Sequence, residues 1–154
     1  LAGVTVFLWS RQLPFDQSLL AGLAVLVVDY LQLVNIPNPS GSRQEDVANL
    51  TRRFKALTGE LGAPVVLLAQ LNRASERREN RVPGLSDLRE SGAIEQDADR
   101  VILLHRPSYY DRNSDEPDMV IVAKDRFGPG GNVRCRFDGE RLRWRDYSAR
   151  GAVL

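Results

Sequence analysis

The 154-residue chain has one cysteine, one histidine and a formal net charge of only +1. A lone Cys135 excludes an internal disulfide and a cysteine zinc site, and one histidine excludes a histidine-based metal site. The small net charge gives no general attraction to nucleic acid or anionic membranes, so contacts with polyanions require local patches. No apolar run reaches the roughly 18 residues that span a bilayer, and no targeting segment is visible. We therefore expect a cytoplasmic protein, and because the first residue is Leu1, a fragment.

The chain contains enough apolar residues for one globular domain with a core, at 43% hydrophobic and 27% charged residues. Four short apolar runs each stop at a polar residue, which is typical of buried strands in an α/β sheet. The first, Ala24 to Val28, stops at Asp29, and the others stop at Gln70, His105 and Lys124. The first run lacks polar alternation and therefore predicts a strand covered on both faces.

A helix is predicted between the first two of these runs. Ser42 and Glu45 form a capping-box pair, apolar residues follow at spacings of three and four, and Gly62 ends the pattern. A second helical segment is expected after Gly92, and an earlier strand is possible at Val4 to Trp9. Residues 72–85 are polar and predict a loop.

The end of the chain has a different pattern. Val133, Cys135 and Phe137 alternate with arginines, and a similar alternation follows the turn-forming pair Asp138 and Gly139. This predicts an antiparallel β-hairpin with one solvated face. The fold class is therefore α/β, with a mostly parallel sheet that ends in a C-terminal hairpin.

The polar residues that end the four runs are candidate site residues. If the four strands are parallel neighbours, Asp29, Gln70, His105 and Lys124 line one edge of the sheet, where such folds bind ligands. Asp29 could hold Mg²⁺, Gln70 could orient a water or sense a terminal phosphate, and Lys124 with Arg126 could meet the charge of a transferred phosphoryl group. The alternative for each is a cap, a turn or a solvated charge, and for His105 we keep that alternative.

Four segments together carry a resemblance to a known family. The longest is the acidic block of residues 86–99, and the others cover residues 28–33, 64–73 and 124–129. In collinear order, they strongly resemble the replicative DNA helicases of the DnaB family. The resemblance covers residues 24–146, whereas residues 1–23 match poorly and residues 147–154 form a tail.

The resemblance implies the C-terminal part of a RecA-like P-loop NTPase motor domain in an ATP-dependent DNA helicase. The family works as a homo-hexamer around single-stranded DNA, uses ATP and Mg²⁺, and meets a primase and a helicase loader. By matching position, Asp29 would bind nucleotide through Mg²⁺ and Gln70 would link the phosphate state to the DNA loops. Lys124 and Arg126 would reach the neighbouring subunit's nucleotide.

The block at 86–99 contains the residues implied to contact DNA, namely Arg89, Glu90 and Gly92. It carries five acidic residues against one arginine, which is the wrong sign for a phosphate cradle. We therefore expect contacts through backbone N–H groups near Gly92 and through the single Arg89, which would grip phosphates without reading bases.

The sequence departs from the family pattern because it has no Gly-x-x-x-x-Gly-Lys-[Ser/Thr] phosphate loop. The glutamate that would activate the attacking water is also missing. We therefore expect no ATPase activity from the 154-residue chain alone. Two alternatives remain open: a recombination or repair ATPase of the wider RecA-like class, and a non-hydrolysing DNA-binding ring subunit.

Overall fold

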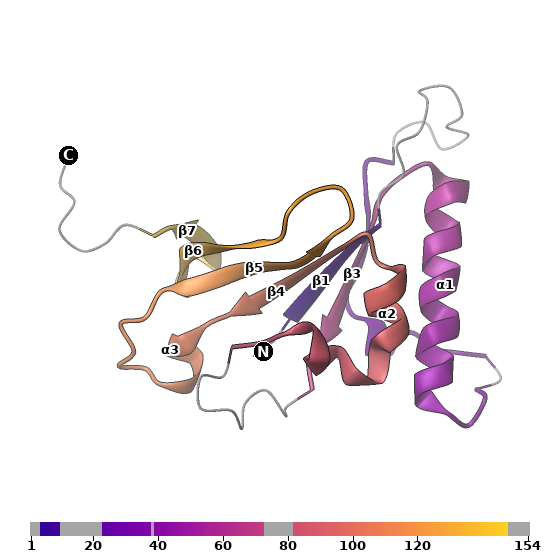
Figure 1. Ribbon diagram of the computed structural model, residues 1–154, viewed down its shortest axis with the longest axis horizontal. Helices are drawn as coiled ribbons and strands as arrows, with labels where there is room; N and C mark the ends of the chain where they lie inside the picture. The colour runs from indigo at the N-terminus through magenta and orange to yellow at the C-terminus, as the bar shows by residue number, and fades with distance from the viewer. Residues whose placement is uncertain (1–3, 10–22, 38, 73–81, 148–154) are drawn as a thin grey trace.

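The computed structural model describes residues 4–9, 23–37, 39–72 and 82–147, with backbone alone at residues 4–9 and 89–91. In these residues, a seven-stranded sheet has the order β2-β3-β1-β4-β5-β6-β7. The helices α1 and α2 stand side by side against one face of this sheet (Figure 1). The arrangement confirms the α/β class.

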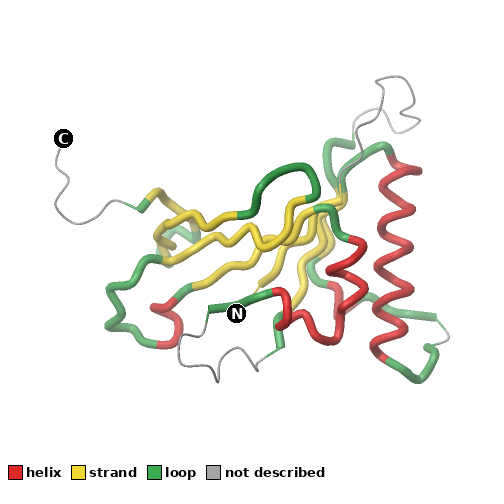
Figure 2. Tube along the Cα trace, viewed as in Figure 1, coloured by secondary structure: helices red, strands yellow, loops and turns green. Residues whose placement is uncertain are grey.

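The elements follow one another as Figure 2 shows. The strands are β1 (Val4–Trp9), β2 (Leu26–Val28), β3 (Val65–Gln70), β4 (Arg100–His105), β5 (Asp118–Asp125), β6 (Gly131–Asp138) and β7 (Arg143–Asp146). The α-helices are α1 (Arg43–Leu61), α2 (Gly92–Asp97) and α3 (Pro107–Tyr110), and the 3₁₀ helices are η1 (Leu31–Leu33) and η3 (Leu85–Ser91). Of the helices in the described ranges, none has the length and apolar character that crossing a bilayer requires.

The long helix α1 begins and ends where the sequence predicts. The Ser42 side chain accepts a hydrogen bond from the Glu45 N–H, and Gly62 adopts the left-handed conformation with φ of 65°. The reciprocal half of the predicted capping box differs, since the Ser42 N–H donates to the Ser40 hydroxyl. The N-terminus is closed further by Asp46, which accepts from the Ser40 N–H at 2.8 Å.

The prediction that the first apolar run is covered on both faces is wrong. Only Leu26–Val28 forms a strand, and Val27 is 56% exposed. The reason is its place in the sheet: β2 is an edge strand that pairs with β3 alone. Val25 and Leu23, just before it, are exposed as well.

The prediction of a mostly parallel sheet also needs correction, because β2 and β3 form the parallel pair of the described strands and the other neighbours are antiparallel. The strand β1 lies between β3 and β4. These two strands run in the same direction but are not hydrogen-bonded to each other. The following strand β5 returns antiparallel to β4, since the connection contains only the four-residue α3 and no crossover helix.

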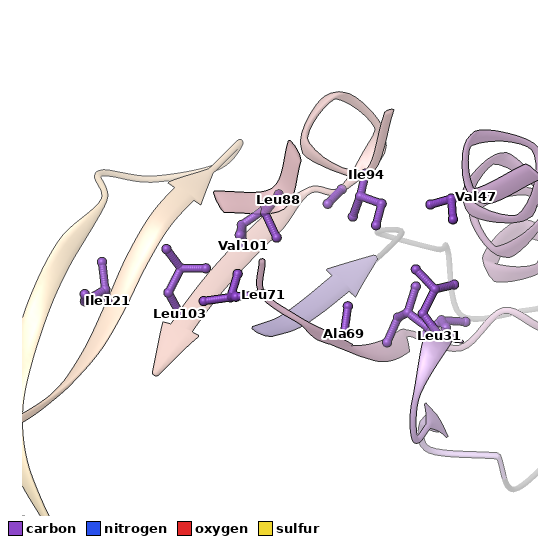
Figure 3. Packing of buried hydrophobic residues seen from close by; sticks show 12 residues of the cluster. Leu31, Val47, Ala69, Leu71, Leu88, Ile94, Val101, Leu103 and Ile121 are labelled. Carbon is purple, nitrogen blue, oxygen red and sulfur yellow. The ribbon is translucent and has the colours of Figure 1, made fainter. Parts of the chain in front are cut away.

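The core lies between the sheet and the helices on its covered face. Alternate residues of β3 and β4 point into it and are fully or almost fully buried, whereas the residues between them are half-buried. Figure 3 shows the packing of these side chains against α1, η3 and α2. The cluster includes Leu67, Leu88, Ile94, Val101 and Leu103. The segment at 85–97 is thus fixed to the sheet by its apolar side chains.

The C-terminal hairpin is confirmed, but its turn is longer than the predicted two residues. Residues 139–142 connect β6 and β7, and Leu142 has a positive φ of 50° and is 79% exposed. Asp138 holds this turn, because its carboxylate accepts bonds from the Arg141 N–H and from the Arg145 guanidinium. Much of the positive charge of the hairpin is therefore paired with Asp138 inside the hairpin.

His105 is buried at the end of β4, where it is 3% exposed. Its Nδ1 has no hydrogen-bond partner among the residues that the structure describes. Burial lowers the pKa of His105, although the charges of Glu116 and Asp118 partly raise it. The side chain therefore belongs to the core and is not the solvated charge that the alternative allowed.

We expect His105 to make the chain less stable in acid. Its pKa in the folded state lies below the ordinary value of 6.5, so below that pH the unfolded chain binds a proton that the folded chain does not. The free energy of unfolding should therefore fall as the pH drops from 6.5 toward the lower pKa of the folded state. In His105→Gln, urea denaturation at a series of pH values should show a shallower fall. Parallel curves for the two proteins would contradict the assignment.

Candidate functional site

Asp29 and Gln70 lie at the same end of their parallel strands. Asp29 is exposed in the bend directly after β2, and Gln70 is the exposed last residue of β3. After Asp29, the buried Leu31 anchors the short helix η1, and Gln32 Nε2 lies 3.5 Å from the Gln70 carbonyl oxygen. An open groove of about 600 Å³ adjoins this region between residues 31–36 and the start of α1.

Asp29 is chemically suited to Mg²⁺, although it is a single carboxylate. An exposed carboxylate is a hard oxygen ligand, and Mg²⁺ bound to a nucleotide commonly keeps several waters and takes one or two protein carboxylates. In the described residues, no three His, Cys, Asp or Glu side chains are grouped to hold a metal ion. The residues therefore fit a metal held mainly by nucleotide phosphates and not a metal held by the protein alone.

The predicted convergence of four site residues on one edge is wrong for Lys124. In the antiparallel pair of β4 and β5, Lys124 lies opposite Val101 and His105 lies opposite Met119, so the two are at opposite ends of the ladder. Between β2 and β5 stand β3, β1 and β4. At about 4.8 Å per strand, Asp29 and Lys124 are roughly 19 Å apart across the sheet. The two cannot touch the same phosphate.

Lys124 and Arg126 instead reach the C-terminal end of α2. The Lys124 ammonium donates to the carbonyl oxygens of Glu95 at 2.5 Å and Gln96 at 3.1 Å. The Arg126 guanidinium donates to the Gln96 carbonyl at 3.2 Å and to Asp99 Oδ1 at 2.8 Å. Both side chains therefore point to the same helix end and do not extend freely into water. These bonds complement the last carbonyls of α2, which lack partners within the helix.

A second lysine joins this cluster from α1. Lys55 Nζ donates to the Asp97 carbonyl oxygen at 2.7 Å and lies 3.4 Å from Asp99 Oδ1. Lys55 and Arg126 both bind the almost buried Asp99 carboxylate, and Lys124 lies close enough for their charges to act on it. Burial lowers the pKa of Lys124, and the charges of Arg126 and Lys55 lower it further, partly offset by Glu95 and Asp99. An added anion would relieve this repulsion.

The turn after β5 fixes the direction of the pair. Asp125 accepts from the Phe127 N–H at 3.0 Å and from Arg100 Nε at 3.0 Å, which closes the chain directly behind Lys124. The bond from Phe127 and the Arg100 guanidinium lower the pKa of Asp125, against the effect of burial. The register of β4 and β5 shifts between Val101 and Ile102, next to the same turn.

The acidic block at 86–99 uses two of its carboxylates to stabilise the fold. Asp87 is 2% exposed and accepts from the Gly84 N–H at 2.8 Å, while the Asp87 carbonyl accepts from Asn72. Asp99 binds the cations described above. These two charges therefore do not repel an approaching phosphate as freely as the sequence alone suggests.

The residues implied to contact DNA lie where η3 passes into α2. Gly92 opens α2 and is exposed, and a Cβ placed on it would meet no atom within 4 Å. Its backbone is therefore accessible. Arg89 and Glu90 lie in η3, and the structure describes their backbone. The loop at 72–85 has residues 73–81 outside the described part.

Sequence reasoning missed Asp99 and Lys55. Asp99 stood in the block that carried the resemblance, yet its charge was counted against phosphate binding and not as a partner for Arg126. Lys55 has no local signal, since 44 residues separate it from Asp99 and only the packing of α1 brings them together. A search for opposite charges at the ends of adjacent elements would identify Asp99 but not Lys55.

The family described as "DnaB-like helicase C terminal domain" matches residues 10–146 of the chain. The replicative DNA helicase DnaB of Buchnera aphidicola subsp. Acyrthosiphon pisum is 45% identical over 129 residues, which cover 82% of this chain and 28% of the relative. That of Leifsonia xyli subsp. xyli is 48% identical over 128 residues, covering 81% and 28%. The chain thus spans less than a third of the length of these relatives.

Two solved structures resemble the fold. One is described as an ATPase domain and has a TM-score of 0.75 and 39% identity, over 80% of this chain and 44% of that one. The structure of a DnaB-like replicative helicase and its interactions with primase has the same TM-score and identity, over 80% and 30% of the two chains. Both agree with a partial RecA-like core.

The close approach at Gly130 predicts a sensitive position in the turn that aims Lys124 and Arg126. A Cβ on Gly130 would lie 2.7 Å from the Val122 carbonyl oxygen, whereas on Gly128 the nearest atom is a side-chain oxygen at 3.6 Å. We expect Gly130→Ala to lower the free energy of unfolding by about 1–3 kcal/mol, and Gly128→Ala to change it by less than about 0.5 kcal/mol. Chemical denaturation of both variants measures this, and equal effects would show that the approach does not constrain the turn.

Proposed function

Because the chain belongs to the DnaB-like helicase C-terminal domain family, we propose that it acts as part of an ATP-dependent replicative DNA helicase. In this proposal, the motor domain assembles as a hexameric ring around single-stranded DNA in the cytoplasm, with Mg²⁺ and ATP bound between subunits. Primase is proposed as a partner, since one of the similar structures is of a DnaB-like replicative helicase and its interactions with primase. A helicase loader is proposed on the family resemblance alone.

The observation that carries the proposal is the distance between the two halves of the candidate site. Asp29 lies on the edge strand β2, and Lys124 with Arg126 lies at the end of β5, roughly 19 Å away across three intervening strands. A single nucleotide on one subunit cannot use both. In a ring, each subunit would offer Asp29 to its own nucleotide and the cationic pair to its neighbour's.

The half-site that acts on the subunit's own nucleotide consists of Asp29 and Gln70. The bound nucleotide and its metal ion supply the phosphoryl group and the charge neutralisation for hydrolysis. Asp29 would hold the metal through an exposed carboxylate, and Gln70 would respond to the terminal phosphate from the same sheet edge. The phosphate loop and the water-activating glutamate are not found in the 154 residues, so these two residues form an incomplete site.

The half-site that acts on the neighbour consists of Lys124 and Arg126. Both side chains are aimed by the turn after β5 and held by α2, and Lys55 adds a third cation beside them. A guanidinium in such a place stabilises charge that develops on the transferred phosphoryl group, as an arginine finger does. Lys124 would bind the same phosphates as a point charge.

Contacts with single-stranded DNA are proposed for Arg89, Glu90 and Gly92. Gly92 offers an accessible backbone at the start of α2, and Arg89 supplies the single positive charge of the block at 86–99. Backbone N–H groups and one guanidinium can bind phosphates without reading the bases. Glu90 is included in this contact on the family resemblance alone.

The comparisons favour this proposal over its alternatives. The relatives reported above are replicative helicases, and not recombination or repair ATPases. A non-hydrolysing ring subunit gains no support from them either. The absence of a phosphate loop in these 154 residues is compatible with a chain that covers 28% of each relative.

The arginine-finger role predicts a large and specific loss of activity. In the intact ring-forming protein that contains these residues, Arg126→Ala should lower ATP turnover by roughly 10³-fold or more, because the charge on the transferred phosphoryl group loses its partner. Ring assembly should persist. Arg145→Ala is a matched control, since it removes an arginine that also binds an aspartate, Asp138, but lies in the C-terminal hairpin and not at the α2 carbonyls.

Mixed rings test whether Arg126 acts on the neighbour. Subunits with Arg126→Ala, combined with subunits whose phosphate-loop lysine is substituted, should regain turnover, because some interfaces then pair an intact Arg126 with an intact loop. Near-normal turnover of Arg126→Ala alone, or inactive mixtures with proven co-assembly, would overturn the assignment.

The proposed DNA contact predicts a loss that does not depend on sequence. Arg89→Ala should weaken binding of single-stranded DNA about equally for different base sequences and reduce the slope of binding against salt by about 1. Fluorescence anisotropy over a range of salt concentrations measures both. Arg112→Ala, an exposed arginine in the connection before β5, should leave them unchanged. A sequence-selective loss, or none, would mean that Arg89 does not bind phosphate.

A further inference from the structure

The proposed DNA segment and α2 form one continuous unit. The 3₁₀ helix η3 ends at Ser91 and α2 begins at Gly92, which keeps helical dihedral angles of −51° and −30°. Leu88 in η3 and Ile94 in α2 are buried in the same core cluster. A displacement of the accessible backbone at Gly92 would therefore carry α2 with it, because no loop separates the two.

The other end of α2 holds the cationic pair. Lys124 donates hydrogen bonds to the carbonyl oxygens of Glu95 and Gln96, and Arg126 donates to the same Gln96 oxygen. These acceptors lie only three to four residues beyond Gly92. The segment proposed to meet DNA and the side chains proposed to meet the neighbouring nucleotide thus touch the two ends of one short helix.

Asp99 fixes Arg126 at two places. The Asp99 carbonyl oxygen accepts from the Arg126 N–H at 2.8 Å, and Asp99 Oδ1 accepts from the guanidinium at 2.8 Å. The Asp99 side chain is 8% exposed, whereas 44% of the Arg126 side-chain surface is exposed. The bonds to Asp99 and Gln96 use two of the five guanidinium N–H donors. Asp99 and Gln96 therefore hold the Arg126 guanidinium on one side, and its remaining N–H donors are available to a partner on the other side.

We propose that Asp99 is a positioning residue for Arg126, and that α2 transmits the state of the DNA-contacting segment to the Lys124–Arg126 pair. The proposal rests on the function proposed above, since it requires Arg126 to act on a nucleotide. Movement of α2 shifts the carbonyls that hold the pair, while Asp99 keeps the guanidinium aligned with the helix end. DNA bound at residues 89–92 thereby changes the position of Lys124 and Arg126 at the nucleotide of the neighbouring subunit.

A purely structural ion pair would have different consequences. It would stabilise the connection between α2 and β4, and its loss would lower stability without changing how turnover responds to DNA. Asp138 offers the matched comparison, because its carboxylate also accepts from an arginine side chain, that of Arg145, and from a backbone N–H, that of Arg141, but it lies in the C-terminal hairpin. The two aspartates therefore separate a loss of stability from a loss of positioning.

The test uses the intact ring-forming protein with Asp99→Asn, Asp138→Asn and Arg126→Ala. ATP turnover is measured with and without oligo-dT, together with the KM for ATP and the affinity for oligo-dT. We expect Asp99→Asn to lower the DNA-stimulated kcat about tenfold, the scale expected when a charged hydrogen bond is weakened. The KM and the oligo-dT affinity should stay within about twofold. Asp138→Asn should keep both the stimulated kcat and its ratio to the unstimulated kcat.

Each other outcome bears on the proposal. If Asp99→Asn behaves like Asp138→Asn, or changes only the denaturation midpoint, the positioning role is overturned while the proposed function stands. If Arg126→Ala itself keeps normal turnover, the proposed function fails first. Should Asp99→Asn prevent ring assembly, Asp99→Glu replaces it: the charge is retained but displaced by one methylene, so kcat should still fall at unchanged affinity, and a normal kcat would contradict the proposal.

Discussion

The arrangement of the candidate site depends on the contact between the C-terminal end of α2 and the end of β5. Helix ends leave backbone carbonyls without partners, and here Lys124 and Arg126 supply the missing donors. Asp99 adds the negative charge that binds both Lys55 and Arg126. This contact joins the sheet to the helical segment that bears the family resemblance, and it sets the direction in which the cationic pair can act.

The sheet topology gives this contact its functional meaning. Since β1 stands between β3 and β4, the end of β5 is separated from β2 by more strands than a simple parallel order would place there. Asp29 and the cationic pair therefore lie at different places on the molecule. A ring of identical subunits is the simplest assembly that brings such separated halves together around one nucleotide.

The sequence predicted the local structure well, because the signals for it are local. The Ser42 cap and Gly62 bound α1, and the alternation around Cys135 marks the hairpin. The pairing of β1 with both β3 and β4 was not predictable, since it joins residues far apart in sequence and leaves no periodic signal in either. The same limit applied to the site: the likeness of Lys124 and Arg126 to a known pair was visible, but Asp99 and Lys55 became partners only through packing.

The central claim is that Arg126 acts on the nucleotide of the neighbouring subunit while α2 holds it from behind. The most direct measurement is a cryo-EM structure of the intact ring with a non-hydrolysable ATP analogue, Mg²⁺ and oligo-dT. The account predicts the Arg126 guanidinium within hydrogen-bond distance of the neighbour's terminal phosphate, with its bond to Asp99 retained. An Arg126 that faces solvent at every nucleotide-filled interface, or that meets the nucleotide of its own subunit, would contradict it.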